Sequence, residues 1–316
     1  MATATTASLV ERAREAFKRT PAGLACVRAA ARLGLLRPRA GHYYSPIPSL
    51  AEVRRDEARS FERSSRVLPG IDLDDRGQVE LLSALARLYP EQPFRARPDG
   101  GTRYHLDNSW FAWADGLFLH LMLRHAQPSR VVEVGSGFSS LVLLDTNERF
   151  FGNRIRLTLV EPDPARLRSR LRPGDASLAE IVERRVQDVD RSLFRELRAG
   201  DVLLVDSSHV SKAGSDVNHL LFAVLPELAP GVLVHFHDVP YPFEYPCEWI
   251  RYGFAWNEAY LLRAFLQHNR AFRVRLWADY VRRFHRPLLE ASMPLCTRGV
   301  PFGVGGSLWL ERTPER

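Results

Sequence analysis

The feature that most constrains the fold is a series of short apolar runs that alternate with helical segments from Ser129 onward. Each run is continuous, with no polar residue at every second position, and the clearest examples read RVVEV, LTLVE, DVLLVD and VLVHF. Continuous apolar runs of this length are typical of strands that helices cover on both faces, as in parallel sheets. The pattern therefore predicts an α/β fold built on a mostly parallel sheet.

The remaining segments complete a two-part organisation. Residues 254–270 have a helical pattern, and the segments FRVRLWADY (272–280) and GGSLWLER (305–312) predict two closing strands. Before the sheet, residues 1–40 read as a helical lead-in, and residues 109–126 are apolar on nearly every side, which predicts a buried helix. We therefore expect an N-terminal helical extension over residues 1–128, covering the substrate side, and a sheet domain over residues 129–316.

Composition narrows the class of protein. The sequence of 316 residues has a formal net charge of +7, but its arginines are spread along the chain and mostly sit beside Asp or Glu, which disfavours a nucleic-acid partner. Its three cysteines show no C-x-x-C spacing, so free thiols are expected. It has no apolar run of about 18 residues and no signal sequence at its start, so we expect a cytoplasmic protein without a membrane partner.

A glycine-containing turn follows the first predicted strand in the segment EVGSGFSS, from Glu133 to Ser140. Gly135 and Gly137 permit a tight turn and a close approach of a ligand to the backbone at the start of a helix. Glu161 ends the next strand, where a carboxylate can accept hydrogen bonds from both hydroxyls of a ribose. Asp188 follows a third short strand, near the place of an adenine ring, while Asp190 is suited to cap the next helix.

These segments resemble the class I S-adenosylmethionine-dependent methyltransferases, in particular a bacterial group associated with sugar and secondary-metabolite biosynthesis. The resemblance rests on RVVEVGSGFSS, LLVDSSHVSKAGSDVN, VHFHDVPYPFEYP and WNEAYLLRAFLQ, and it extends from about Gly41 to the end. It implies a Rossmann-like sheet with an antiparallel last strand. It also implies S-adenosylmethionine as cofactor: its methionine part at the turn of Glu133, Gly135 and Gly137, its ribose at Glu161 and its adenine at Asp188.

Two further strand ends carry polar residues that concern the methyl acceptor. Asp206 ends the fourth strand and His209 follows three residues later, while His237 and Asp238 end the fifth strand. Ligands of open parallel sheets bind beyond the carboxyl ends of the strands, so these side chains are expected to lie close together. His235 is expected to be a core residue.

This group of side chains allows two kinds of chemistry. Asp206, His237 and Asp238 are suitable ligands for a divalent metal such as Mg²⁺ or Mn²⁺, as in the catechol-type O-methyltransferases, which this segment resembles apart from its His-Asp pair. In the alternative without a metal, His209 or His237 removes a proton from the acceptor, with Asp206 beside it. The aromatic residues that follow, namely Tyr241, Phe243, Tyr245 and Trp249, are candidates for the wall of the acceptor pocket.

The sequence thus predicts methyl transfer from S-adenosylmethionine to a hydroxyl, or less readily an amine, of a small molecule such as a sugar or a specialised metabolite. Two other functions remain open at this stage. One is a nucleic-acid methyltransferase, although the N/D-P-P-Y/F signature of base-amine methyltransferases is missing. The other is a scaffold that binds S-adenosylmethionine without catalysis. The sequence does not decide between a monomer and a homo-oligomer.

Overall fold

The computed structural model describes residues 20–23, 25–26, 40–298 and 306–314. The chain divides into two compact units, Met1–Glu57 and Ala58–Arg316. In the first unit, helix α3 (Leu50–Arg55) begins with a capping box, in which the side chains of Ser49 and Glu52 each accept a hydrogen bond from the other residue's backbone N–H. Most of the helical lead-in predicted for residues 1–40 lies outside the described residues.

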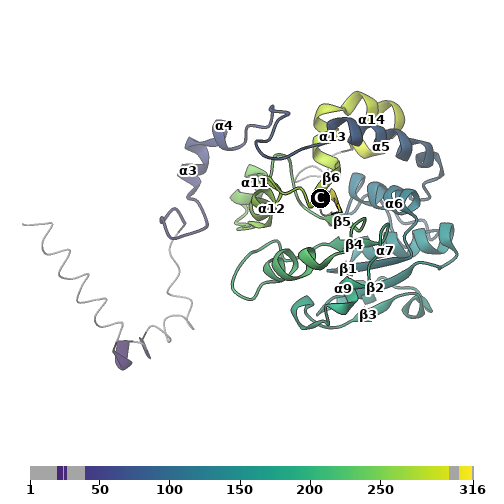
Figure 1. The fold of residues 1–316 in the computed structure, drawn as a ribbon, viewed down its shortest axis with the longest axis horizontal. Coiled ribbons are helices and arrows are strands. Elements are labelled where there is room, and N and C mark those ends of the chain that lie inside the picture. Colours follow the sequence, from purple (N-terminus) through teal and green to yellow (C-terminus); the bar gives the residue numbers. More distant parts are fainter. Residues whose placement is uncertain (1–19, 24, 27–39, 299–305, 315–316) are drawn as a thin grey trace, which may run out of the picture. The chain divides into compact units, whose positions relative to one another are not determined.

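In the described part of the second unit, seven strands form one sheet in the order β3-β2-β1-β4-β5-β7-β6 (Figure 1). Neighbouring strands from β1 to β5 are parallel, and β7 is antiparallel to both β5 and β6. The predicted mostly parallel sheet with an antiparallel last strand is confirmed. The strands are β1 (Arg130–Val134), β2 (Arg156–Val160), β3 (Glu180–Val182), β4 (Val202–Val205), β5 (Leu233–Phe236), β6 (Phe272–Trp277) and β7 (Leu308–Arg312).

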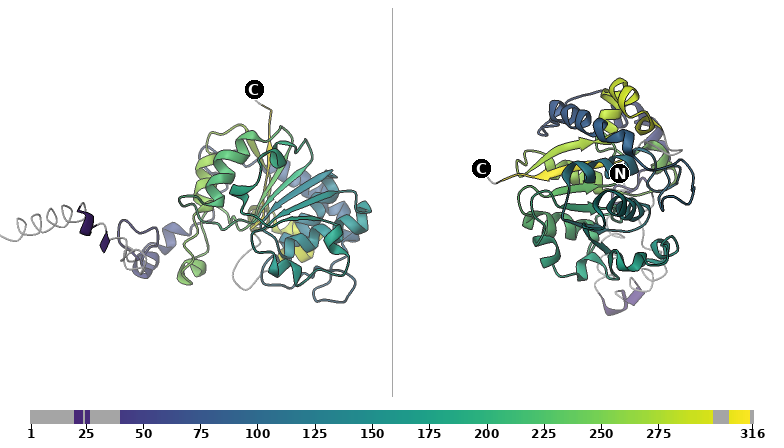
Figure 2. Two further views of the ribbon diagram at one scale, coloured as in Figure 1. Left: turned by 90° about the horizontal axis from the view of Figure 1, so that it is seen from below. Right: turned by 90° about the vertical axis from the view of Figure 1, so that its right-hand side faces the viewer.

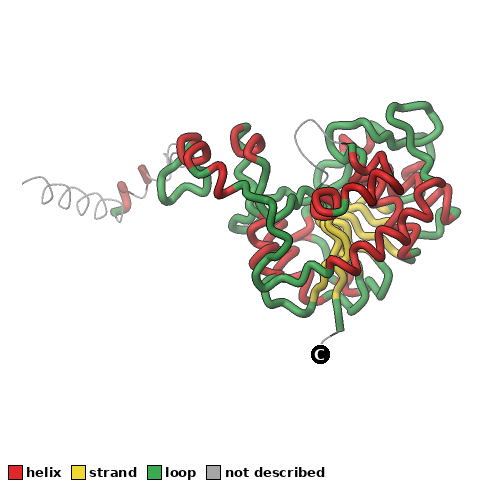
Figure 3. Tube along the Cα trace, turned by 90° about the horizontal axis from the view of Figure 1, so that it is seen from above, coloured by secondary structure: helices red, strands yellow, loops and turns green. Residues whose placement is uncertain are grey.

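The strands β4 and β5 lie at the centre of the sheet because their sequences are continuously apolar. Every residue of β4 and β5 is buried, as expected for strands that helices cover on both faces. Strand β6 is shorter than the predicted segment 272–280, because Trp277 pairs with Leu308, the first residue of β7, and the chain then turns into a helix at Ala278. Figure 3 shows the strands running between helices.

Helices lie on both sides of the sheet (Figure 2). On one side, α6 contacts α5, α7 and α13. The helices of this unit, with α4 at its boundary, are α4 (Glu57–Ser60), α5 (Asp75–Leu88), α6 (Ala114–Ala126), α7 (Phe138–Thr146), α8 (Ala165–Arg168), α9 (Ser192–Arg195), α10 (Asp216–His219), α11 (Cys247–Arg251), α12 (Glu258–Leu266), α13 (Ala278–Phe284) and α14 (Arg286–Ser292). The structure therefore packs α5 and α6, which we assigned to the extension of residues 1–128, with the sheet.

Helix α6 and the loop before it confirm part of the prediction for residues 109–126. All side chains from Ala114 to Leu123 are buried, as the apolar sequence predicts. Residues 109–113 are not helical, because Asn108 Oδ1 accepts hydrogen bonds from the backbone N–H groups of Trp110 and Phe111 and holds them in a turn. None of the helices in the described ranges has the length and apolar character that a membrane span requires. Cys26 and Cys296 are free thiols, as predicted.

Candidate active site

The turn between β1 and α7 requires glycine at its first position. Gly135 has a φ of +83°, and a Cβ atom there would lie 2.0 Å from the backbone oxygen of Asp206. Gly137 differs, since the nearest atom to a Cβ built there is Arg166 Cδ at 3.8 Å. The turn is thus packed tightly against the end of β4 at Gly135, whereas a Cβ atom at Gly137 would make only an ordinary contact with Arg166.

Ser140 explains why this turn needs no third glycine. Its hydroxyl accepts a hydrogen bond from the Gly137 N–H at 3.0 Å and donates one to Glu133 at the end of β1. Burial raises the pKa of Glu133 to about 8, although the hydroxyls of Ser139 and Ser140 oppose this shift. The Glu133 carboxyl group is therefore largely protonated at neutral pH, and one of its oxygens, Oε1, is buried without a partner.

Glu161 lies beside the turn, at the end of β2, as the sequence predicts. Its carboxylate accepts a hydrogen bond from the Ser136 N–H at 3.0 Å and another from the Asp163 N–H at 2.9 Å. Each oxygen is thus fixed by one backbone donor, and a carboxylate oxygen can accept more than one hydrogen bond. The geometry leaves Glu161 able to bind hydroxyl groups next to the glycine turn.

Asp188 is placed differently from the other predicted cofactor residues. It ends a 3₁₀ turn, Val186–Asp188, is exposed, and forms an ion pair with Arg185 at 2.8 Å. Its predicted approach to adenine stays a prediction. The expected cap role of Asp190 is wrong: the N-cap of α9 is Arg191, and Asp190, one residue earlier, only accepts a hydrogen bond from the Ser192 N–H.

The polar residues after β4 and β5 come together, as predicted. The Nε2 atom of His209 lies 3.5 Å from Asp206 Oδ1 and 3.9 Å from Asp238 Oδ2. His237 Nε2 lies 3.5 Å from Asp238 Oδ1. We call Asp206, His209, His237 and Asp238 the acceptor cluster. Its carboxylates are partly exposed, whereas both imidazoles are buried.

Glu258, the first residue of α12, contacts the acceptor cluster through His209, and the sequence did not identify it as a site residue. Its carboxylate lies 2.9 Å from His209 Nδ1 and also accepts a hydrogen bond from Ser207 Oγ. Glu258 is almost fully buried, at 1% exposure, so a charge there needs such a partner. The signal in the sequence was an acidic residue at the start of a mostly apolar helix that also carries Arg263, and a plain helix N-terminus explains this pattern equally well.

The electrostatics of the cluster follow from these contacts. Burial alone lowers the pKa of His209, but the carboxylates of Asp206 and Glu258 outweigh burial and raise it well above its ordinary value. Burial alone raises the pKa of Asp206, but the imidazoles of His237 and His209 lower it below its ordinary value. The cluster therefore holds an imidazolium between carboxylates at neutral pH.

The two histidines of β5 and its end differ in their surroundings. His237 Nε2 donates a hydrogen bond to the backbone oxygen of Trp110 at 3.2 Å, and its Nδ1 is buried without a partner. His235 is buried and bonds to Ser307 Oγ at 3.0 Å, and burial lowers its pKa to about 3. His235 is thus a neutral residue of the core, as expected.

The predicted aromatic wall is wrong at three of its four positions. Tyr241, Phe243 and Tyr245 are at most 3% exposed, because they pack into the core instead of facing a ligand. Two other aromatic side chains contact the acceptor cluster: the ring centroid of Trp256 lies 4.4 Å from that of His209, and the ring centroid of Phe111 lies 4.7 Å from that of His237. Trp249 packs edge-on against Trp256.

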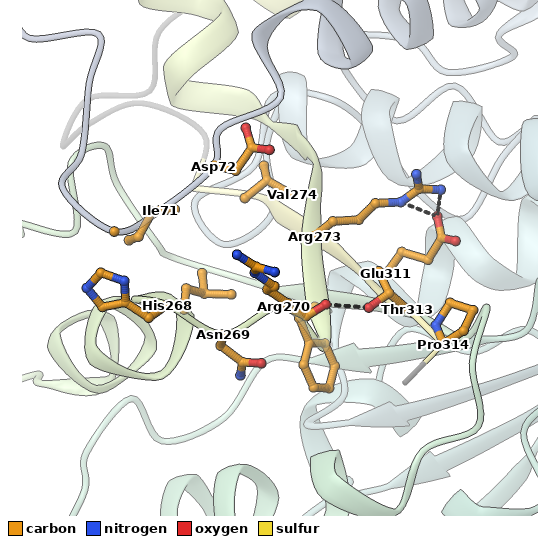
Figure 4. Close-up of a pocket in the computed structure, with 13 residues that line it drawn as sticks. Ile71, Asp72, His268, Asn269, Arg270, Arg273, Val274, Glu311, Thr313 and Pro314 are labelled. Carbon is orange, nitrogen blue, oxygen red and sulfur yellow. Dashed lines mark hydrogen bonds and ion pairs between the residues drawn. The ribbon is translucent and has the colours of Figure 1, made fainter. Parts of the chain in front are cut away.

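A surface pocket of about 740 Å³ lies away from this cluster (Figure 4). It lies at the amino end of β5, where Glu311 of β7 pairs with Leu233, and its lining includes His268 and Arg270. Glu311 forms ion pairs with Arg273 at 2.8 Å and with Arg275 at 3.3 Å. None of the predicted site residues lines this pocket, so we place the candidate site at the carboxyl ends of the strands.

Residues 132–239 match the family model of a methyltransferase domain. This segment begins in β1 and ends directly after His237 and Asp238, so it contains the glycine turn, Glu161 and the acceptor cluster. An uncharacterised protein of Archaeoglobus fulgidus is 36% identical to this chain over 162 residues, which cover 50% of this chain and 72% of the relative. This chain belongs to the class I S-adenosylmethionine-dependent methyltransferases.

Solved structures of methyltransferases are similar to this one at low identity. The O-methyltransferase TomG of Streptomyces achromogenes, in complex with S-adenosylmethionine, is 18% identical, with a TM-score of 0.42 over 77% of this chain and 92% of that chain. A putative O-methyltransferase of Klebsiella pneumoniae is 14% identical, with a TM-score of 0.38 over 84% of this chain and 97% of that chain. At these TM-scores, neither structure carries an argument about the site.

The turn and the acid beside it fit S-adenosylmethionine. A Cβ atom at Gly137 would meet no atom closer than 3.8 Å, the hydroxyl of Ser136 is buried without a partner, and Glu161 is held where it can accept from ribose hydroxyls. These residues would hold the cofactor, which supplies an electrophilic methyl group when bound. The residues at the ends of β4 and β5 are then left to hold the acceptor.

Replacing Glu161 with alanine is expected to weaken the binding of S-adenosylhomocysteine about tenfold or more, because it removes a charged acceptor of hydrogen bonds from the ribose. Isothermal titration calorimetry measures this affinity directly. A suitable control is Glu183→Ala, since Glu183 is an exposed acid that pairs with Arg168. An affinity that stays at the wild-type value in Glu161→Ala would remove the ribose role from this residue.

Proposed function

We propose that this methyltransferase transfers the methyl group to a hydroxyl of a small molecule such as a sugar or a specialised metabolite, and that His209 accepts the hydroxyl proton. The observation that carries the proposal is the placement of His209 at the end of β4, with Nδ1 bonded to Glu258 and Nε2 directed toward Asp206 and Asp238. Hydrogen bonding at one ring nitrogen fixes both the ring orientation and the tautomer of a catalytic histidine.

The arrangement suits the chemical need of the reaction. Methyl transfer requires donor and acceptor to be held in line, and the acceptor oxygen must lose its proton as its bond to carbon forms. With its Nδ1–H directed to Glu258, the neutral His209 ring offers its Nε2 lone pair to the hydroxyl. Because nearby carboxylates raise the pKa of His209, the neutral form becomes more abundant as the pH rises above neutrality.

A second candidate is a metal-assisted version of the same transfer. Two carboxylates, Asp206 and Asp238, face one point and belong to the oxygen ligands that Mg²⁺ and Mn²⁺ prefer, with His237 as a third ligand. As arranged here, however, His209 lies between these carboxylates. Across the described ranges, no group of three or more His, Cys, Asp or Glu side chains is placed to hold a metal ion. We therefore favour the imidazole version.

Chelation separates the two versions. The imidazole version predicts that EDTA-treated protein retains its full methyl-transfer rate, because Asp206 and Asp238 act on His209 directly. The assay incubates the protein with S-adenosylmethionine and a panel of sugars, phenols and other hydroxylated compounds, and detects both S-adenosylhomocysteine and the methylated product by mass spectrometry. Loss of the rate in EDTA, with recovery in Mg²⁺ or Mn²⁺, would instead support Asp206, His237 and Asp238 as metal ligands.

The same assay tests the choice of a small acceptor over a nucleic acid. Arginines paired with acids support a small molecule, since Arg191 and Arg195 both bind Glu227 and are less available to phosphates. Including RNA and duplex DNA in the panel tests this directly, because methylation of either would contradict the proposal. Cofactor binding without turnover on any member of the panel would support a non-catalytic scaffold.

A further inference from the structure

Arg166 lies at the mouth of the glycine turn. It belongs to the short helix α8, which follows Glu161 and the end of β2, and its Cδ is the nearest atom to a Cβ placed on Gly137. Its guanidinium carbon lies 4.0 Å from the centre of the Trp110 indole ring. The side of the turn that Gly137 faces is therefore bordered by a cation.

The guanidinium of Arg166 is free to bind an anion. The side chain is exposed, and within the described ranges its guanidinium makes no ion pair or hydrogen bond with another residue, so its N–H donors are accessible. The other cationic groups around the turn differ. Arg170 lies over the Phe138 ring and donates to the Arg166 carbonyl and Ser169 Oγ. Burial lowers the pKa of His105, which keeps that ring neutral.

Trp110 holds the Arg166 guanidinium against its indole ring, and the backbone of Trp110 is itself held in place. The turn made by Asn108 sets the backbone of Trp110, and the Trp110 carbonyl is held by His237 Nε2 at 3.2 Å. An arginine stacked on an indole face is stabilised by the cation–π interaction and loses less freedom when it binds a ligand. Trp110 thus connects the acceptor cluster with the cation beside Gly137.

The charges around the turn require a cation for one part of the cofactor. S-adenosylmethionine carries a sulfonium, an ammonium and a carboxylate group on its methionine part. Glu161 and Asp206 lie beside the turn, and their negative charge attracts the first two groups and repels the third. A carboxylate that leaves water for this site needs a partner of opposite charge.

We propose that Arg166, backed by Trp110, binds the carboxylate of the cofactor's methionine part. The planar guanidinium can form two parallel N–H···O bonds with a carboxylate, which gives both affinity and orientation. Because the donor methyl group lies a few bonds from this carboxylate, anchoring it also orients the methyl group toward the acceptor cluster. This assignment depends on the family membership and not on the identity of the acceptor.

Calorimetry with two ligands tests the assignment. S-adenosylhomocysteine keeps the carboxylate, whereas 5′-methylthioadenosine keeps the adenosine and the sulfur but lacks the amino-acid part. Arg166→Ala is expected to weaken the binding of S-adenosylhomocysteine about 10- to 100-fold, the range of a hydrogen bond between charged groups, and to leave the affinity for 5′-methylthioadenosine unchanged. Arg166→Lys should retain part of the affinity for S-adenosylhomocysteine, since lysine keeps the positive charge but lacks the planar, two-pronged guanidinium.

The matched control is Arg168→Ala, on the same helix, because the Arg168 side chain pairs with Glu183 away from the turn. It should bind both ligands as the wild type does. Equal weakening of both ligands in Arg166→Ala would show a general disturbance of the site and overturn the assignment. Unchanged binding of both ligands, or no binding of S-adenosylhomocysteine by the wild type, would overturn it as well.

Discussion

Replacing His209 with glutamine is expected to lower the rate of methyl transfer about 10²- to 10⁴-fold, the usual contribution of a general base. Glutamine can still bond to Glu258 but cannot accept a proton from a hydroxyl. The affinity for S-adenosylhomocysteine should stay at the wild-type value, because His209 lies at the acceptor end of the site. The measurements are the initial rate with an accepted substrate from the panel and calorimetry with S-adenosylhomocysteine.

His268→Gln is a close control, because His268 also has a positive φ, +59° against +58° at His209, and lines the pocket at the other end of the sheet. Its rate should be that of the wild type. The pH profile gives a second readout. In the wild type, the rate should rise with pH as the imidazolium of His209 loses its proton.

Glu258→Gln should move this rise to lower pH, since a neutral amide no longer stabilises the imidazolium, whose pKa therefore falls. A wild-type rate that instead decreases as His209 deprotonates would show that the charged imidazolium is the active form. A wild-type rate in His209→Gln would place the base elsewhere.

Much of this site could be predicted from the sequence because its residues directly follow the ends of strands. Apolar runs identify strands, and the residues directly after parallel strands must meet at one edge of the sheet. This reasoning located Gly135, Glu161 and Asp206, and it predicted that His209 and Asp238 lie close together. The same rule failed for the aromatic residues after β5, because a loop residue can point into the core as easily as toward a ligand.

Glu258 and Arg166 show what the sequence could not supply. Glu258 is 49 positions from His209, and only the packing of α12 against the end of β4 joins them. Arg166 is one of many arginines in this chain, and nothing in its local sequence sets it apart from Arg168. Which arginine is paired and which is free depends on where acids from other elements come to lie. Charge partners at long sequence separation therefore need the fold.

Replacing Gly135 with alanine is expected to reduce the free energy of unfolding by at least ~3 kcal/mol, through backbone strain and a steric clash together. The added Cβ would lie 2.0 Å from the backbone oxygen of Asp206, a contact that must be relieved by moving the turn or the end of β4. Chemical denaturation, followed by circular dichroism, measures the loss.

Gly100→Ala separates the two causes of this loss. Gly100 has a φ of +80°, close to the +83° of Gly135, but a Cβ there would meet no atom within 4 Å. It should cost about 1–2 kcal/mol, the penalty of an L-residue in the left-handed region. Equal losses in the two variants would mean that the turn does not lie against β4 as closely as the structure has it. A larger loss in Gly135→Ala would confirm the contact, and that contact holds Asp206 beside the cofactor turn, so the same glycine that admits the cofactor also places the acceptor cluster.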